Sequence, residues 1–134
     1  MGLIIDTSII IALEKGKLNP EVWEAYEQGY ISPITLTELL IGVDRADNEN
    51  RRIKRLAFIE HILASLIILP FGGEEARIYS KIIHNLYKER ITLDTNDMLI
   101  ATSAIANGYP ILTLNVKDFK KIQGLEVITV SLKD

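Results

Sequence analysis

Short runs of apolar residues recur along the chain and alternate with segments of helical periodicity. The strand-like runs are LII (3–5), YIS (30–32), LIIL (66–69), ILTL (111–114) and VITV (127–130). Strands that are apolar at nearly every position are buried on both faces, which is typical of a parallel sheet covered by helices on both sides. The sequence therefore predicts a three-layer α/β/α fold with a five-stranded parallel sheet.

Helices are expected between these strands. Apolar spacing and end signals place them over residues 7–14, 22–28, 35–41, 47–65, 74–89 and 96–107. The helix over VWEAYEQ (22–28) is expected from Asn19 as the N-cap, Pro20 at the first position and Gly29 at the C-terminal end. Within it, we expect Trp23 to be partly exposed or buried against another chain, because large aromatics often anchor partners.

The order of the strands follows from the handedness of the connections. Parallel strands joined by helices are linked by right-handed crossovers. If the chain winds outward in both directions from the first strand, the strand order is 3-2-1-4-5. The switch point then lies between the first and fourth strands, where sites form at the carboxyl ends of the strands.

Composition limits the classes of protein that the chain can belong to. The 134 residues are 48% hydrophobic, which is enough for one compact domain over 1–134. There is no cysteine, so disulfides, thiolate zinc sites and cysteine nucleophiles are excluded, in agreement with a cytoplasmic location. We expect no membrane-spanning segment. The net charge of −3 argues against a general nucleic-acid binder, although RRIKR (51–55) and KDFKK (117–121) are locally basic.

Four acidic residues fall where the predicted sheet would gather them. Asp6 and Asp118 follow the first and fourth strands, and Asp97 lies in the first turn of the helix that leads to the fourth strand. Glu38 reaches the same edge from the helix after the second strand. Four unpaired carboxylates at one edge would repel one another, and a divalent cation removes that conflict. The sequence therefore predicts a metal site.

Ligation by oxygen alone favours Mg²⁺ or Mn²⁺ and suits phosphodiester hydrolysis. Asp6 and Asp118 are predicted metal ligands, Asp97 a direct or water-mediated ligand, and Glu38 the group that positions or deprotonates the attacking water. The neighbouring polar residues predicted to orient carboxylates or water are Thr7, Ser8, Thr113 and Asn115. We expect His61 and His84 to lie on helices away from the site.

Each acid also has a simpler explanation. Asp6 could cap the following helix, and Asp97 could favour the dipole of its own helix. Glu38 could complete a capping box with Thr35. Asp94 is a fifth acid nearby and is assigned to the turn LDTN. The conjunction of four acids at one edge favours the metal site over four separate coincidences.

These segments resemble the PIN-domain nucleases, and among them the VapC-type toxins of toxin–antitoxin pairs. The matching stretches are LIIDTSIII, TLTELLIG, NDMLIATSAIANGYPILTLNVKDF and GLEVI, which run from one end of the chain to the other. The resemblance implies that Asp6, Glu38, Asp97 and Asp118 bind Mg²⁺ or Mn²⁺, with Ser8 and Asn115 as polar positions beside them. It further implies an endoribonuclease that cleaves RNA, a homodimer, and a small antitoxin that covers the site.

Three alternatives stay open at this point. A receiver or phosphatase shares the sheet and an acidic pocket, but the motifs of those families are absent from the chain. A catalytically silent PIN-like scaffold that binds RNA or protein is disfavoured by the presence of all four acids. A housekeeping RNA-processing nuclease would carry the same residues as a toxin.

Overall fold

Five parallel strands form one sheet in the computed structural model, which describes residues 1–133. The strands are β1 (Gly2–Ile5), β2 (Gln28–Ile31), β3 (Leu66–Ile68), β4 (Ile111–Leu112) and β5 (Val127–Ile128). Their order is β3-β2-β1-β4-β5, with every neighbouring pair parallel. The predicted order 3-2-1-4-5 is therefore confirmed, although β4 and β5 are each two residues shorter than their apolar runs.

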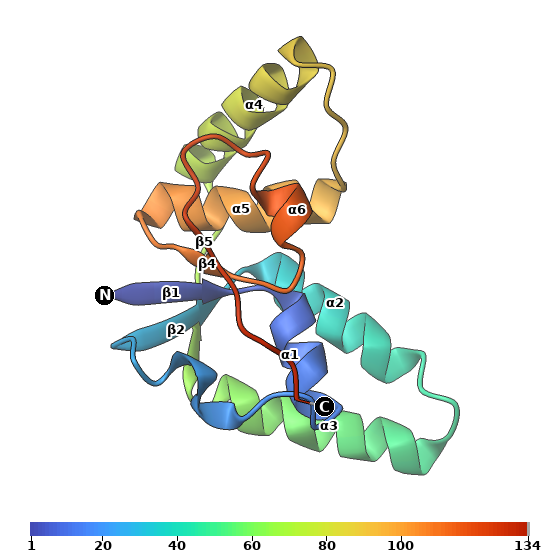
Figure 1. Cartoon of the computed structure of the whole chain (residues 1–134). Coiled ribbons are helices and arrows are strands. Elements are labelled where there is room, and N and C mark those ends of the chain that lie inside the picture. The colour runs from blue at the N-terminus through green and yellow to red at the C-terminus, as the bar shows by residue number, and fades with distance from the viewer. Residues whose placement is uncertain (134) are drawn as a thin grey trace.

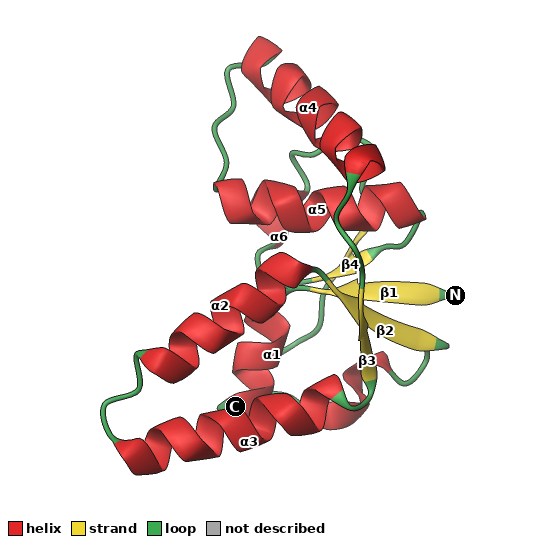
Figure 2. Cartoon of the chain, turned by 180° about the vertical axis from the view of Figure 1, so that it is seen from behind, coloured by secondary structure: helices red, strands yellow, loops and turns green. Residues whose placement is uncertain are grey.

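Helices cover both faces of this sheet (Figures 1 and 2). They are α1 (Thr7–Glu14), α2 (Pro33–Asp44), α3 (Glu49–Leu63), α4 (Gly73–Lys88), α5 (Thr95–Asn107) and α6 (Val116–Phe119). Helices α4 and α5 lie on one side of the sheet, while α1 and α3 lie on the other, with α2 packed beside α3. Within residues 1–133, no helix combines the length and the apolar character needed to cross a membrane.

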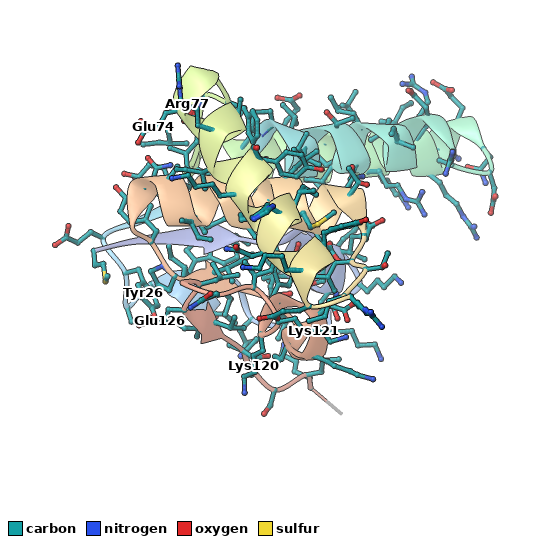
Figure 3. All side chains as sticks on the ribbon, turned by 90° about the horizontal axis from the view of Figure 1, so that it is seen from above. Tyr26, Glu74, Arg77, Lys120, Lys121 and Glu126 are labelled. Atoms are coloured by element: carbon teal, nitrogen blue, oxygen red, sulfur yellow. The ribbon has the colours of Figure 1, made fainter. Side chains whose placement is uncertain are left out.

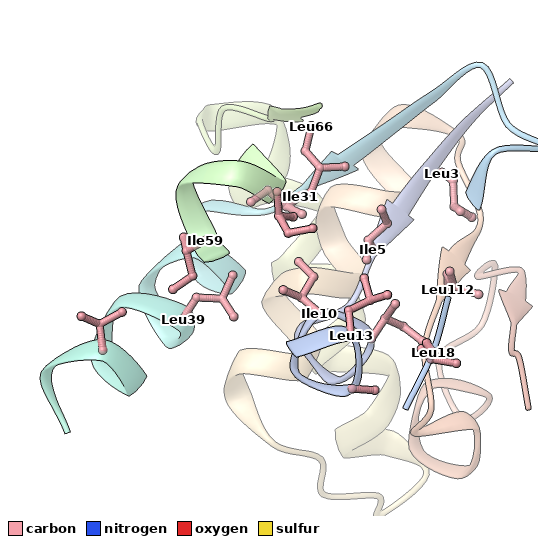
Figure 4. Close-up of a cluster of buried hydrophobic side chains, with 14 residues drawn as sticks. Leu3, Ile5, Ile10, Leu13, Leu18, Ile31, Leu39, Ile59, Leu66 and Leu112 are labelled. Atoms are coloured by element: carbon pink, nitrogen blue, oxygen red, sulfur yellow. The ribbon is translucent and has the colours of Figure 1, made fainter. Parts of the chain in front are cut away.

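The central strand explains why the apolar runs are continuous. Leu3 and Ile5 point into the core cluster shared with α1, α2 and α3, which Figure 4 shows from within. Ile4 points to the opposite face, where it joins α4 and α5. All three side chains are fully buried. Helices cover both faces of the sheet, so a polar side chain at any of these three positions would be removed from water. All three residues are accordingly apolar.

The helix predicted over residues 22–28 is wrong. Only a 3-10 helix forms, over Pro20–Trp23, and the strand β2 already begins at Gln28. Gly29 lies inside that strand and does not end a helix. A Cβ at this position would lie 2.7 Å from Leu66 Cδ2 and 2.9 Å from Ile5 Cδ1, so the glycine is required by close packing between neighbouring strands. Trp23 is half-buried and packs against the core. This agrees with the prediction that its side chain is partly exposed.

Helix α2 begins two residues before its predicted start. Ser32 is its N-cap, with the hydroxyl Oγ accepting a hydrogen bond from the backbone N–H of Ile34 at 3.0 Å. Pro33 occupies the first helical position, where its missing N–H has no cost. Thr35 therefore lies inside the helix and is fully buried. The capping box between Thr35 and Glu38 is wrong, which leaves the Glu38 carboxylate free for another role.

Candidate active site at the carboxyl edge of the sheet

Asp6 stands at the junction of β1 and α1 and is almost fully buried. It occupies the N-cap position of α1, but its carboxylate makes no capping hydrogen bond to the helix backbone. Its Oδ2 instead accepts hydrogen bonds from the hydroxyls of Ser8 and Thr113, each at 2.7 Å. The simple capping explanation for Asp6 is therefore wrong. The Asp6 carboxylate therefore points toward the end of β4, the strand next to β1.

Ser8 and Thr113 also receive backbone hydrogen bonds from the segment after β4. The Ser8 hydroxyl accepts from Leu114 N at 3.1 Å, and the Thr113 hydroxyl accepts from Asn115 N at 2.9 Å. Each hydroxyl therefore donates to Asp6 and accepts from the backbone at the same time. This arrangement fixes the Asp6 carboxylate relative to the loop that carries Asn115.

Asn115 lies between two of the acids. Its side-chain Nδ2 donates to Asp97 Oδ2 and to Asp118 Oδ2, both at 3.2 Å. Asp118 lies in the short helix α6, which the sequence analysis did not predict, and so it reaches the site from that helix instead of directly from the strand end. Lys121, which follows α6, lies 3.7 Å from the other oxygen of Asp118. Figure 3 shows Lys120 and Lys121 beside α6, far from Glu74 and Arg77 of α4.

Asp97 lies in the first turn of α5, and a separate residue caps that helix. The carboxylate of Asp94 accepts from Asp97 N at 3.3 Å, so Asp94 belongs to the turn before the helix, as predicted. The Asp97 side chain is not needed as a cap. It is free to point at Asn115 and the acids beyond it.

Glu38 reaches the same region from the second turn of α2. Its Oε1 accepts a hydrogen bond from the Thr7 hydroxyl at 2.7 Å, and its Oε2 lies 3.4 Å from the donor Nδ2 of Asn96. Thr7 begins α1 and Asn96 lies in the first turn of α5. The structure therefore brings Glu38 to the junction of three helices, two of which start beside Asp6 and Asp97.

The electrostatics of the site centre on Asp97. Partial burial first, and then the negative charges of Asp6, Asp94, Glu38 and Asp118, together raise the pKa of its carboxyl to about 6. Of these four acids, only Asp94 is a neighbour of Asp97 in the sequence. A cation placed among them would favour the ionised form of all these groups.

The donor set matches a hard divalent cation in its chemistry. Apart from the Lys121 ammonium beside Asp118, the polar side chains that contact these acids are hydroxyls and neutral amides, while His61 and His84 are exposed on α3 and α4 as expected. Within residues 1–133, no three acidic or histidine side chains already stand as the ligand set of an ion. The carboxylates instead take hydroxyl and amide partners, which is how buried acids reduce their mutual repulsion. The negative charges of Asp6, Glu38 and Asp118 still contribute to the raised pKa of Asp97.

A groove between α1, α2 and α3 begins at Glu38. Its lining is mainly apolar, with a few charged groups: Ile10, Ile11, Glu14, Lys15, Glu38, Leu39, Gly42, Arg55, Phe58 and Ile59. Arg55 donates to the backbone oxygen of Gly42 at 2.8 Å and lies 3.9 Å from the Glu14 carboxylate. The groove is therefore an apolar surface next to Glu38, and it contains the guanidinium of Arg55, which is held by Gly42 and Glu14.

Sequence reasoning missed two polar residues of this site. Thr35 is buried inside α2 with its hydroxyl oxygen 3.0 Å from that of Thr7, and Asn96 contacts Glu38. A buried threonine on an apolar helix is an ordinary observation in a sequence. Asn96 could have been suspected only from its position directly before Asp97.

Comparison with known proteins agrees with this geometry. The PIN domain family model matches residues 3–125. The chain is 68% identical to Ribonuclease VapC1 of Rickettsia felis and 62% identical to Ribonuclease VapC of Rickettsia bellii, in each case over 100% of both chains. These relatives span the same length as the chain, so the resemblance is not confined to the motifs around the acids.

Solved structures with the same fold include two VapBC proteins bound to DNA. VapBC2 from Rickettsia felis, bound to a DNA fragment from its promoter, superposes with a TM-score of 0.89 at 24% identity, covering 98% of this chain and 100% of that chain. DNA-bound VapBC from Salmonella typhimurium gives a TM-score of 0.85 at 25% identity, covering 96% and 98%. The resemblance stated from sequence is confirmed: the chain belongs to the PIN-domain family and, within it, to the VapC ribonucleases.

Proposed function

We propose that this chain, acting as a single domain over residues 1–134, is a Mg²⁺- or Mn²⁺-dependent endoribonuclease and the toxin of a type II toxin–antitoxin pair. The observation that carries the proposal is the approach of Asp6, Glu38, Asp97 and Asp118 at one edge of the sheet, with the pKa of Asp97 raised by burial and by the other acids. Relatives at 68% and 62% identity are named ribonucleases. RNA is therefore the proposed substrate.

The acids divide into two groups by their surroundings. Asp6, Asp97 and Asp118 are linked through the loop after β4, by Thr113 at Asp6 and by Asn115 at the other two. These three residues would hold the metal. Glu38 approaches from α2 with its own donors and would orient or deprotonate the attacking water.

A bound Mg²⁺ or Mn²⁺ supplies Lewis acidity, which lowers the pKa of a coordinated water and offsets the charge that develops on the phosphate. The chain supplies the rest. Ser8 and Thr113 hold the Asp6 carboxylate in place by donating to the same oxygen, and Asn115 lies between Asp97 and Asp118 without adding charge. Lys121 offers a cation 3.7 Å from Asp118, at the margin where an RNA phosphate would approach.

Cleavage of RNA in the presence and absence of metal tests this proposal. Purified protein is incubated with total RNA and Mn²⁺, with Mg²⁺, or with a chelator, and the products are mapped. Wild type is expected to cut only with metal, while Asp6→Asn loses activity by at least about 10³-fold and keeps its fold. Glu60→Gln, which alters an exposed acid on α3, is the matched control and retains cleavage. Equal cutting by wild type and Asp6→Asn would identify a contaminating nuclease.

A small antitoxin is the proposed protein partner. The solved complexes of similar fold contain VapB with VapC, and the groove beside Glu38 is the apolar surface that such a partner could cover while blocking the acids. Ile11, on the wall of this groove, has 40% of its surface exposed. An apolar segment bound there would bury Ile11 and exclude RNA from Glu38.

Substitution in the groove tests the antitoxin without touching the acids. Ile11→Glu is expected to cut RNA like wild type but to escape inhibition by the proposed antitoxin, which is to be sought in the adjacent open reading frame. Ile53→Glu, at an exposed position on α3 outside the groove lining, is the matched control and stays inhibited. If Ile11→Glu is inhibited as strongly as wild type, the partner binds elsewhere.

Two further properties belong to the same proposal: the first comes from the resemblance, and the second from the absence of cysteine. We expect a homodimer, which sedimentation equilibrium measures directly, and a cytoplasmic location, which fractionation of cells measures. A monomeric mass at micromolar concentration would contradict the first, and recovery of the protein outside the cytoplasm would contradict the second.

A further inference from the structure

The Glu38 carboxylate has a separate donor at each oxygen. Thr7 donates its hydroxyl to Oε1 at 2.7 Å, and Asn96 directs Nδ2 to Oε2 at 3.4 Å. These donors come from α1 and α5, whereas Glu38 lies on α2. The carboxylate is therefore held from two sides by elements other than its own helix.

The donor on α1 is supported by a second buried hydroxyl. Thr35 Oγ1 lies 3.0 Å from Thr7 Oγ1, and both residues are buried. A hydroxyl has one proton, and the shorter contact to the Glu38 carboxylate uses that of Thr7. Thr7 Oγ1 is the donor toward Thr35 Oγ1 as well, so its hydroxyl faces both acceptors and the Thr35 oxygen helps to place it beside Glu38. Buried hydroxyls are costly without partners, so this contact keeps two polar groups at the helix junction.

The donor on α5 connects Glu38 to the turn that carries Asp97. Asn96 directly precedes Asp97, and the cap formed by Asp94 fixes the backbone of this turn. A movement of α5 would therefore displace Asn96 and Asp97 together. The contact couples the position of Glu38 to that of the other acids.

The groove between α1, α2 and α3 offers the Glu38 carboxylate an alternative position. Glu38 shares the lining of that groove with two cations, Lys15 and Arg55. Opposite charges attract, and a Glu38 side chain without its donors could rotate toward them. Holding Glu38 on the side of the acids would keep it available for the water and away from the groove.

We infer that Asn96 and Thr7, the latter supported by Thr35, are positioning residues that hold the Glu38 carboxylate in its working orientation; the inference rests on the proposed nuclease function. We call these three residues the Glu38 clamp. They touch neither metal nor substrate in this account, and they act through Glu38 alone.

Kinetics of clamp variants give the first test. Thr7→Val and Asn96→Leu remove a donor at similar side-chain volume, and each lowers kcat by about 10- to 100-fold with little change in KM for RNA. Thr7→Ser restores the hydroxyl and returns most of the activity. Thr102→Val and Asn107→Ala are matched controls, since these two side chains donate only to backbone oxygens within α5, and both keep kcat. Full activity in Thr7→Val and in Asn96→Leu would overturn the inference.

Removing Glu38 separates positioning from a general effect on the fold. In a Glu38→Ala background, measured in single turnover with enzyme in excess, Thr7→Val and Asn96→Leu produce no further loss, because the group that they orient is gone. Losses that multiply with that of Glu38→Ala would show that the two residues act independently of Glu38, and would overturn the inference.

A spectroscopic measurement on metal-free protein does not depend on cleavage. The side-chain amide resonances of Asn96 are expected to shift between wild type and Glu38→Ala, while those of Asn107 stay in place. If the Asn96 resonances do not move, the clamp does not exist, whatever the activity. If they move but wild type cuts no RNA, the clamp stands and the proposed nuclease function fails.

Discussion

Thr113 donates its hydroxyl to Oδ2 of Asp6 at 2.7 Å, across 107 positions of sequence. The contact exists because β1 and β4 are neighbours in the sheet, with Ile5 opposite Leu112 in the register. Asp6 and Thr113 are the residues that follow this pair. The strand order therefore determines which side chain supports the buried carboxylate.

Removing the Thr113 hydroxyl is expected to weaken both stability and activity. Thr113→Val leaves Asp6 with Ser8 as its hydroxyl donor and removes the acceptor for Asn115 N. Loss of a buried donor to a charged group costs about 1–3 kcal/mol in the free energy of unfolding, and we expect cleavage to fall by about tenfold or more. Chemical denaturation and initial cleavage rates measure the two effects. Unchanged stability would mean that water replaces the hydroxyl.

Loss of the Asn115 side-chain amide is expected to weaken the binding of Mn²⁺. Asn115→Ala removes the donor between Asp97 and Asp118, so the two carboxylates repel without a neutral group between them. We expect Mn²⁺ affinity to fall by about 10- to 100-fold, as measured by isothermal titration. Asn107→Ala on the outer end of α5 is the comparison, and it keeps wild-type affinity. Equal Mn²⁺ affinity in the two variants would show that Asn115 does not contribute to metal binding.

The raised pKa of Asp97 predicts a pH-dependent stability in metal-free protein. Its ordinary value is 3.8 and its folded value is about 6, so the folded state binds the proton more tightly than the unfolded state. The stability from this group is complete below pH about 4 and is lost as pH rises through about 6. Asp97→Asn abolishes that loss. We expect its Tm at pH 7.5 in chelator to exceed that of wild type by about 4 °C, from roughly 1 kcal/mol after solvent screening.

The comparison at low pH checks the sign of this effect. Near pH 4 the wild-type carboxyl is protonated in the folded protein, so the difference in Tm between the two proteins should be small. A variant that is less stable than wild type at pH 7.5 without metal would show that Asp97 is not destabilised by its neighbours.

Two glycines should respond to alanine with opposite signs. Gly29→Ala places a Cβ 2.7 Å from Leu66 Cδ2 and 2.9 Å from Ile5 Cδ1, which costs about 1–3 kcal/mol in the free energy of unfolding. Gly42→Ala, inside α2, meets nothing within 4 Å and gains about 0.5–1 kcal/mol from helix propensity. Thermal melts of the two variants measure both. A neutral Gly29→Ala would show that the neighbouring strands can move apart.

The fold was predictable because its strongest signals are local. Continuous apolar strands, helical spacing and the handedness of crossovers gave the sheet order once the chain was taken to wind outward in both directions from the first strand. The helix expected over residues 22–28 failed because Gly29 looks like a helix end in sequence, whereas its role is to let two strands and their side chains approach. That requirement involves Ile5 and Leu66, which are remote in sequence, and no local pattern reveals it.

The site was predictable in part for the same reason. The positions of all four acids follow from the strand ends and helices of the predicted sheet, and the resemblance to VapC proteins names the same four. The contacts of Asn96 and Thr35 depend on how α1, α2 and α5 meet, which is a matter of tertiary packing. Helix α6 has only four residues, too few for a periodic signal, and so the route by which Asp118 enters the site was not visible.

We propose that Asp6, Asp97 and Asp118 hold one cation site for RNA hydrolysis, with Glu38 beside it. Anomalous diffraction from crystals soaked in Mn²⁺ tests this most directly, because manganese is located without reference to activity. We expect a peak at coordination distance from carboxylate oxygens of these three aspartates, and we expect it to disappear in Asp97→Asn crystals. Manganese bound only elsewhere, or a peak that survives without change in Asp97→Asn, would contradict it.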